Sequence, residues 1–249
     1  MTEDPKKYLK EGERIDSVQR DGLSIIQDPS KFCFGMDAVL LSAFVRANEG
    51  ERILDLCTGN GIIPILLYAK TKGTSITGLE IQEEIAEMAA RSVAMNGIGD
   101  RVSIEAGDLK DASKIFGASS FDIVTSNPPY MSKSHGIPNK DSAKYIARHE
   151  EKCTLHDLVL ETAKLLKPKG RCYFVHRPLR LVELFSEMHK YGIEPKRMRL
   201  VYPYYDREAN MVLVEGIRGA KPELRTEKPL IIYKEANIYS DEVISIYND

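Results

Sequence analysis

The sequence predicts an α/β fold with a mostly parallel sheet of seven strands, of which the last is antiparallel, and with helices on both faces. Short apolar segments alternate with segments of helical spacing along most of the 249 residues. Several apolar segments end in a glycine, an acid or an asparagine, which places polar residues at successive strand ends on one edge of a parallel sheet. With 43% hydrophobic residues, the chain can bury a sizeable core.

Composition narrows the class of protein. No apolar run approaches the roughly 20 residues that a membrane span requires, and the N-terminus has no apolar signal core. We therefore expect a cytoplasmic protein with no membrane partner. The cysteines lie far apart without a CxxC pair, so neither a disulfide framework nor a metal site is expected. They are Cys33, Cys57, Cys153 and Cys172.

Residues 1–35 are expected to form an N-terminal arm and strand, ahead of a main domain that covers 36–249. The segment to about Gln19 is polar, which is typical of an exposed arm or a short helix. The alternation of residues 23–27 then predicts a strand. Asp37 precedes an apolar segment and is expected to be the N-cap of the next helix.

The stretch 53–61, ILDLCTGNG, has the pattern of a strand, a tight turn and the start of a helix. Gly59 and Gly61 can adopt positive φ and let a ligand approach the main chain, with helix N–H groups directed at it. A nucleotide-like cofactor is therefore predicted here. The dinucleotide fingerprint requires a third glycine where this chain has Pro64, which disfavours a nicotinamide cofactor and an oxidoreductase.

Two further strand ends carry acids. The segment 75–80 predicts a strand that ends in Glu80, 21 residues beyond Gly59. That spacing is close to the roughly 20 residues at which a carboxylate accepts hydrogen bonds from both ribose hydroxyls of a nucleotide. A third predicted strand, 101–105, is followed by Asp108.

The fourth predicted strand runs into Asn127, Pro128, Pro129 and Tyr130, whose residue types suit recognition of an aromatic amine. An adenine amine is a poor nucleophile because its lone pair is delocalised into the ring. If the Asn127 side-chain oxygen and the Pro128 carbonyl each accept one N–H bond, the nitrogen is held towards tetrahedral geometry. The prolines stiffen the loop, and Tyr130 offers an aromatic face on which a flipped base can stack. Asn-Pro turns are also common without such a function.

Basic residues concentrate in the second half of the chain. Residues 1–130 carry a net charge of −6, whereas residues 131–225 carry +7. This asymmetry favours a polyanion as partner, although solvated surface lysines are the alternative interpretation. The polar insertion 131–152 lies beside the asparagine motif and is expected to contact substrate. Its candidate phosphate-binding residues are Lys133, Lys140, Lys144 and Arg148.

The last predicted strands, within 195–205 and 209–219, are expected to form an antiparallel pair. The first of them interleaves cations with aromatic residues, a pattern suited to RNA and equally found on strand edges. These residues are Lys196, Arg197, Arg199, Tyr202, Tyr204 and Tyr205.

Taken in order, these motifs resemble the bacterial tRNA(Val) adenine N(6)-methyltransferase family, whose members modify the adenosine next to the anticodon. The family belongs to the class I S-adenosylmethionine (SAM) methyltransferases, which have a Rossmann-like fold. The resemblance is carried by FGMDAVLLSAF, ILDLCTGNGIIPILL, GLEIQ, AGDL, SNPPY, ARHE and GAKPELRTEKPLIIY. It implies an enzyme that uses SAM to methylate the exocyclic amine of adenosine 37 in tRNA(Val). We expect a monomer, because no exposed apolar stripe stands out.

The resemblance also implies roles for single residues. The acid Asp55 and the glycine loop would contact the amino-acid half of SAM, which carries an ammonium group, and Asp108 would accept the adenine N–H. The implied cofactor contacts are Phe34, Asp37, Asp55, Thr58, Gly59, Asn60, Gly61, Glu80, Ile81, Asp108, Leu109 and Asn127. Recognition of the substrate amine is implied at Asn127, Pro128, Pro129 and Tyr130.

Three alternatives remain open on sequence grounds. Related enzymes use the same NPPY motif for glutamine side-chain amides of release factors or for guanine amines of rRNA. The glutamine enzymes resemble this chain with an added helical N-terminal domain, and fewer than 40 residues precede FGMDA here. The third alternative is a catalytically idle SAM-binding or RNA-chaperone module, against which the intact motif argues.

Overall fold

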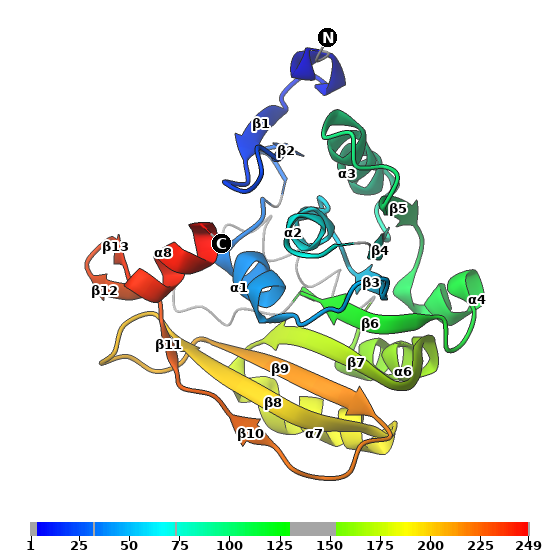
Figure 1. Cartoon of the computed structure of the whole chain (residues 1–249), viewed down its shortest axis with the longest axis vertical. Helices are drawn as coiled ribbons and strands as arrows, with labels where there is room; N and C mark the ends of the chain where they lie inside the picture. The colour runs from blue at the N-terminus through cyan, green and yellow to red at the C-terminus, as the bar shows by residue number, and fades with distance from the viewer. Residues whose placement is uncertain (1–3, 32, 73, 130–152, 249) are drawn as a thin grey trace.

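The computed structural model describes residues 4–31, 33–72, 74–129 and 153–248, which build one large sheet of nine strands and two small hairpins. The order of the large sheet is β10-β8-β9-β7-β6-β3-β4-β5, and β11 also pairs with β8 (Figure 1). The strands are β1 (Arg14–Ser17), β2 (Ser24–Gln27), β3 (Arg52–Leu56), β4 (Ser75–Glu80), β5 (Val102–Ala106), β6 (Phe121–Ser126), β7 (Leu166–His176), β8 (Ile193–Tyr202), β9 (Met211–Arg218), β10 (Arg225–Thr226), β11 (Leu230–Ile231), β12 (Tyr233–Glu235) and β13 (Ile238–Tyr239).

The predicted fold class is confirmed. Every neighbouring pair in the large sheet is parallel except those of β9, which runs antiparallel to both β7 and β8. The sheet is longer than the predicted seven strands, because β10 and β11 extend it beyond β8. Each of these two strands has only two residues, too few to show a period of alternating apolar residues.

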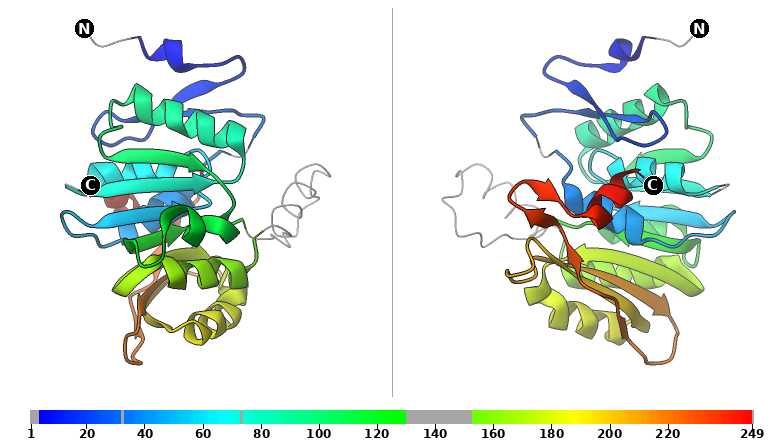
Figure 2. Two further views of the ribbon diagram at one scale, coloured as in Figure 1. Left: turned by 90° about the vertical axis from the view of Figure 1, so that its right-hand side faces the viewer. Right: turned by 60° about the vertical axis from the view of Figure 1, so that its left-hand side comes forward.

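Helices cover both faces of the sheet (Figures 1 and 2). Successive strand residues point to opposite faces, so Ile53 and Ile123 join one core cluster while Leu54 and Val124 join another. The first cluster packs under α1, α2, α3 and α8, and the second under α4, α6 and α7. The helices are α1 (Met36–Phe44), α2 (Ile62–Lys70), α3 (Glu83–Met95), α4 (Ala112–Phe116), α6 (Leu155–Leu165), α7 (Leu181–Lys190) and α8 (Asp241–Asn248), with short 3-10 helices η1 (Pro5–Tyr8), η2 (Leu109–Asp111) and η3 (Pro178–Arg180).

The N-terminal residues form an antiparallel hairpin, β1 and β2, that packs on α3. The backbone N–H of Ile26 donates to the hydroxyl of Ser92 at 3.0 Å. The guanidinium of Arg91 pairs with the carboxylate of Glu13 at 2.6 Å. The hairpin is therefore fixed to the domain by main-chain and charged contacts together.

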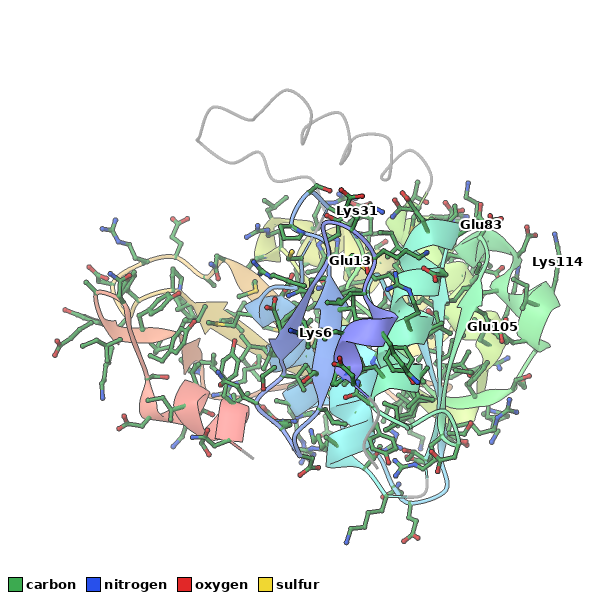
Figure 3. The ribbon with its side chains drawn as sticks, turned by 90° about the horizontal axis from the view of Figure 1, so that it is seen from above. Lys6, Glu13, Lys31, Glu83, Glu105 and Lys114 are labelled. Atoms are coloured by element: carbon green, nitrogen blue, oxygen red, sulfur yellow. The ribbon has the colours of Figure 1, made fainter. Side chains whose placement is uncertain are left out.

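The sequence predicted the hairpin only in part. The predicted strand 23–27 is confirmed as β2, and the polar segment to Gln19 contains the short helix η1. The strand β1 departs from the expected arm, because Ile15 is its only apolar residue and no alternation marks it. In the view from above, the segment that carries Lys6 and Glu13 lies nearest the viewer (Figure 3).

The helix α1 begins one residue before Asp37. Its N-cap is Gly35, which has extended backbone angles and no side-chain cap. The prediction that Asp37 is the N-cap is therefore wrong. Asp37 lies in the first turn instead, and its Oδ1 accepts the N–H of Ala38 at 3.0 Å. A carboxylate there interacts favourably with the positive end of the helix dipole.

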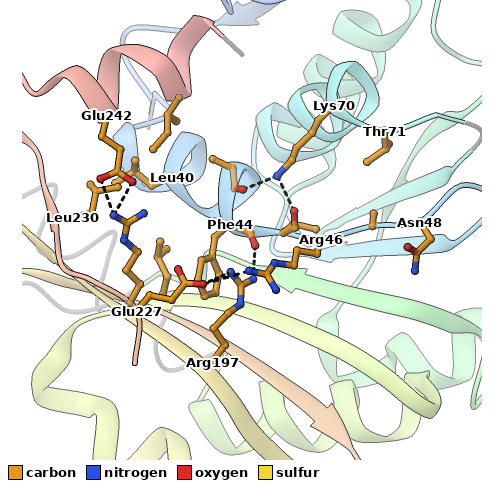
Figure 4. A pocket seen from close by; sticks show the side chains of 16 residues that line it. Leu40, Phe44, Arg46, Asn48, Lys70, Thr71, Arg197, Glu227, Leu230 and Glu242 are labelled. Carbon is orange, nitrogen blue, oxygen red and sulfur yellow. Dashed lines mark hydrogen bonds and ion pairs between the residues drawn. The ribbon is translucent and has the colours of Figure 1, made fainter. Parts of the chain in front are cut away.

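A cavity of about 470 Å³ lies between the end of α1, β8 and α8 (Figure 4). Arg197 enters it from β8 and is 9% exposed. Its guanidinium donates to Glu215 at 2.6 Å, to Glu227 at 2.9 Å and to the carbonyl of Phe44 at 2.7 Å. Arg199 likewise pairs with Glu242 at 2.7 Å. Both arginines of the predicted RNA-binding pattern are thus engaged within the protein.

Replacing Arg197 with methionine should lower the free energy of unfolding by about 3 to 5 kcal/mol, because it leaves the carboxylates of Glu215 and Glu227 without their buried partner. The matched control is Arg46→Ala, since Arg46 is well exposed and lies 3.5 Å from Glu227, and it should cost about 1 kcal/mol or less. Urea unfolding of both variants measures the difference. Equal small losses would show that the buried pairs contribute little.

Candidate functional site

A second cavity, of about 480 Å³, opens at the carboxyl ends of β3, β4 and β6. This edge is where open parallel sheets bind their ligands. Segments far apart in the sequence form its lining, and most of the predicted cofactor contacts are among them. These are Phe34, Asp37, Thr58, Gly59, Asn60, Glu80, Ile81, Asp108, Leu109 and Asn127.

The glycine loop forms the floor of this cavity between β3 and α2. Cys57, Gly59 and Gly61 all have φ between 55° and 83°, so the chain turns sharply before the helix starts. The turn lies close to β4, since a Cβ placed on Gly78 would come within 2.7 Å of the Thr58 hydroxyl oxygen. Residues 57–60 of this turn line the cavity.

Glu80 lies at the end of β4 and is 5% exposed. Its Oε2 accepts the backbone N–H of Gly59 at 3.0 Å, and its Oε1 accepts the backbone N–H of Gln82 at 3.0 Å. These bonds fix the carboxylate between the glycine loop and the start of α3. Oε1 also accepts the side-chain amide of Gln82 at 3.2 Å, whereas Oε2 has further lone-pair capacity to accept a ligand hydroxyl.

Asp55 is fully buried and does not line the cavity. Thr125 is the residue of β6 that pairs with Asp55, and its hydroxyl donates to Oδ1 at 2.6 Å. Oδ2 has no hydrogen-bond partner among the described residues. Burial raises the pKa of Asp55 to about 7, and the nearby carboxylate of Glu80 acts in the same direction. A direct contact between Asp55 and the cofactor remains a prediction.

Gly61 also lies outside the lining of the cavity. It is the N-cap of α2, with φ of 83°, and a Cβ at this position would lie 3.2 Å from the Cβ of Ala89. The structure thus gives Gly61 a role in packing α2 against α3. Its predicted contact with the cofactor is likewise untested.

The raised pKa of Asp55 predicts how stability depends on pH. The folded state favours the protonated carboxyl, so the wild type should lose stability as pH rises from about 4 to about 7, by up to about 1.4 kcal/mol per pH unit. Asp55→Asn resembles the protonated form and should not show this loss. Urea unfolding of both proteins from pH 4 to pH 8 gives the difference in stability. The other carboxylates contribute equally to both proteins, so their effect cancels in this difference. A difference that is independent of pH would contradict the assignment.

Asn127 and Pro128 follow β6 at the rim of the cavity. The Ser126 hydroxyl before them donates to the carbonyl of Leu56 at 2.7 Å, which ties the end of β6 to β3. The side-chain Oδ1 of Asn127 is buried and has no hydrogen-bond partner among the described residues. A buried acceptor without a donor is costly, and a ligand N–H would satisfy it.

Several predicted residues lie outside the described part of the chain. They are Tyr130 of the asparagine motif and the candidate phosphate-binding residues Lys133, Lys140, Lys144 and Arg148. Pro129, by contrast, lines the cavity with Asn127 and Pro128.

Phe34, in the segment before α1, and Asp37, in the first turn of α1, also line the cavity. Gln27 of β2 holds this segment, since its Oε1 accepts the backbone N–H of Phe34 at 3.1 Å and the side-chain amide of Asn60 at 3.2 Å. Gln27 is 3% exposed. It therefore links the N-terminal hairpin directly to the glycine loop.

Asp108 and Leu109 close the cavity beyond β5. The Asp108 carboxylate caps η2 by accepting the backbone N–H of Lys110 at 2.9 Å. Gly107 before it donates its N–H to the carbonyl of Glu80 at 2.9 Å. This bond holds the end of β5 beside the end of β4.

Comparisons with known proteins agree with this geometry. Residues 47–199 match a family model described as a methyltransferase domain. A protein of Porphyromonas gingivalis named tRNA1(Val) (adenine(37)-N6)-methyltransferase is 30% identical over 221 residues, which cover 85% of this chain and 86% of that protein. This chain belongs to that methyltransferase family. A Bacteroides fragilis relative with the same name is 29% identical over 213 residues, which cover 85% of this chain and 87% of the relative.

The methyltransferase fold is also seen in a solved structure. A predicted O-methyltransferase of Agrobacterium tumefaciens superposes with a TM-score of 0.71 at 21% identity, covering 86% of this chain and 96% of that chain. At this identity the likeness concerns the fold alone. Among the described residues of this family member, no three His, Cys, Asp or Glu side chains are grouped to hold a metal ion. None of the helices in the described part has the length and apolar character of a membrane span.

Sequence reasoning missed Arg177 and Cys153, which line the cavity of this methyltransferase. Arg177 follows β7, and its guanidinium donates to the carbonyl of Asn210 at 3.0 Å. Its neighbour His176 is buried, which lowers its pKa to about 4 and keeps the imidazole neutral at pH 7. The position of Arg177 at a fifth strand end was the signal that could have found it.

Proposed function

We propose that the protein transfers a methyl group from SAM to the exocyclic amine of adenosine 37 in tRNA(Val). The observation that carries this proposal is the buried and unpartnered Oδ1 of Asn127, which lies in the lining of the same cavity as Glu80. The chain belongs to a family whose relatives carry the name of this activity. The site thus offers both an acceptor for the amine and a place for the methyl donor.

The residues present suit SAM. The cavity volume of about 480 Å³ falls within the usual range for small-molecule sites. Glu80 would accept the ribose hydroxyls, and Asp108 with Leu109 would hold the adenine. The glycine loop would contact the amino-acid end, and Asp55 beneath it would favour the ammonium group electrostatically once ionised. SAM supplies an electrophilic methyl group on a sulfonium.

The protein would activate the amine by position. Asn127 Oδ1 and the Pro128 carbonyl each accept one N–H of the adenine amine, so that its lone pair faces the methyl group. The new N–C bond forms as the sulfonium S–C bond breaks, and the proton leaves the nitrogen after transfer, when it has become acidic. No base is needed before the attack, so positioning and electrostatics carry the rate.

We propose that the insertion 131–152 belongs to the substrate side of the site. We propose that Tyr130 stacks on the target base and that the basic residues of the insertion contact tRNA phosphates. Because tRNA is a cytoplasmic substrate, the protein would act in the cytoplasm, and we propose that it does so as a monomer. The basic residues are Lys133, Lys140, Lys144 and Arg148.

A substrate exchange tests this function. Purified protein is given labelled SAM with tRNA(Val) transcripts that carry adenosine or guanosine at position 37, and in separate reactions with release factor or rRNA. We expect label only in the adenosine-37 transcript. Label in the guanosine-37 transcript would overturn the position, and label only in release factor or rRNA would overturn the substrate class.

A further inference from the structure

Four tyrosines stack face to face at the β8 end of the sheet. Tyr204 stacks on Tyr233 with ring centres 5.3 Å apart, Tyr233 on Tyr239 at 5.2 Å, and Tyr239 on Tyr247 at 6.0 Å. The planes of successive rings differ by only 15° to 29°. We call this group the tyrosine stack. It joins the loop between β8 and β9 to β12, β13 and α8, which lie together in Figure 1.

Residues near both ends of the tyrosine stack interact with residues that line the catalytic cavity. At one end α8 packs on α1, and the Asp37 carboxylate contributes, after burial and the neighbouring tyrosines, to raising the pKa of Tyr247 to about 12. Asp37 lines the cavity. At the other end Tyr204 belongs to the loop 203–210, whose Asn210 carbonyl binds the guanidinium of Arg177, also a lining residue. The loop 203–210 follows β8, which runs in the same direction as β6 and β7, so the stack lies at the same edge of the sheet as the cavity.

The loop that holds Tyr204 presents a further aromatic ring to solvent. Tyr205 is 83% exposed, although it follows the stacked Tyr204 directly. The N–H of Arg207 donates to the carbonyl of Tyr204 at 3.2 Å, which places Tyr205 within a tight turn. A second hydrogen bond also fixes the loop, because the backbone N–H of Tyr233 donates to the carbonyl of Pro203 at 3.0 Å. Tyr205 is thus an exposed ring on a rigid support.

The arginines near the tyrosine stack differ in their exposure and in their partners. Arg197 and Arg199 of the same strand are engaged by Glu215, Glu227 and Glu242. Arg207, by contrast, is exposed, and the exposed acids Asp206 and Glu208 flank it. The loop therefore offers RNA the stacking face of Tyr205 rather than a net positive charge.

Resting on the proposed function, we propose that Tyr205, supported by the tyrosine stack, stacks on an unpaired base of the tRNA loop that flanks the target adenosine. Flipping the target base into the cavity removes a stacking partner from its neighbour. An exposed aromatic ring at the same edge of the sheet as the cavity replaces that partner. Single-stranded RNA bases are commonly bound in this way, on tyrosine, phenylalanine or tryptophan rings.

The test measures stacking directly. An anticodon stem-loop of tRNA(Val) carries 2-aminopurine, whose fluorescence falls on stacking, next to the target adenosine. We expect quenching on binding to the wild type and to Tyr205→Phe, and loss of that quenching with Tyr205→Ala. Tyr205→Ala should also weaken stem-loop binding about 10-fold and raise KM for tRNA, while the Kd for SAM stays unchanged.

The control is Leu224→Ala, which truncates a residue 40% exposed just before β10, whose pairing with Arg197 places it towards the amino end of β8 and away from the loop 203–210. It should leave quenching, stem-loop affinity and KM unchanged. Wild-type affinity and quenching in Tyr205→Ala would overturn the inference while leaving the proposed function intact. A wild type that neither binds nor methylates the RNA would overturn the proposed function, and the inference with it.

Discussion

Replacing Asn127 with alanine should lower kcat about 100- to 1000-fold while changing the Kd for SAM by no more than about twofold. The buried Oδ1 of Asn127 has no partner among the described residues, so its acceptor capacity is unused until an amine enters the cavity. Its removal therefore costs energy mainly in the reacting complex. Single-turnover methyl transfer gives the rate of the chemical step, and calorimetric titration gives the SAM affinity.

A matched variant distinguishes the role of the Asn127 oxygen as a hydrogen-bond acceptor from the effect of the size of the side chain. Asn127→Asp keeps the acceptor oxygen in a side chain of the same size, so it should retain more activity than Asn127→Ala. Equal losses in the two variants would argue against a role as acceptor. A fall in SAM affinity as large as the fall in kcat would place Asn127 in cofactor binding instead.

Replacing Glu80 with alanine should have the second large effect, a rise of about 100-fold or more in the Kd for SAM. Each hydrogen bond from a ribose hydroxyl to a carboxylate is worth about 1.5 to 3 kcal/mol, and Glu80 would accept two. The variant also leaves the N–H groups of Gly59 and Gln82 without their acceptor, which loosens the loop that contacts the cofactor. Titration with SAM measures the loss.

The control for Glu80 is Glu83→Ala, because Glu83 is an exposed acid at the start of α3, three residues from Glu80. We expect it to bind SAM as the wild type does. With saturating SAM, Glu80→Ala should recover much of its kcat. A change in Kd below about threefold would mean that Glu80 acts only in holding the glycine loop.

The parts of the site that follow from the chain's spacing were predictable. Glu80 ends a strand, and Asp108 and Asn127 follow strands. The carboxyl ends of parallel strands meet at one edge, so the order of these residues in the sequence placed them together. Asp55 has the same kind of position, yet its side chain points beneath the cavity towards Thr125. Residue order alone does not reveal to which side of a strand end a side chain turns.

The contacts that depend on distant segments were not predictable. Gln27 joins residues 7 and 33 positions away, and nothing in its neighbourhood distinguishes it from any polar strand residue. The tyrosine stack needs segments near 204, 233 and 247 to converge. Of the interleaved cations and tyrosines near 200, only the structure separates the internally paired Arg197 from the exposed Tyr205.

Methyl transfer to an adenine amine in tRNA can be tested in a single experiment. The most direct test incubates the purified protein with labelled SAM and total tRNA from cells that lack it, and then identifies the labelled nucleoside. We predict label in N(6)-methyladenosine from one tRNA species, and labelling that is about 100-fold slower or more with Asn127→Ala under the same conditions. Label in any other nucleoside, or no label in RNA while a protein substrate is methylated, would contradict the claim.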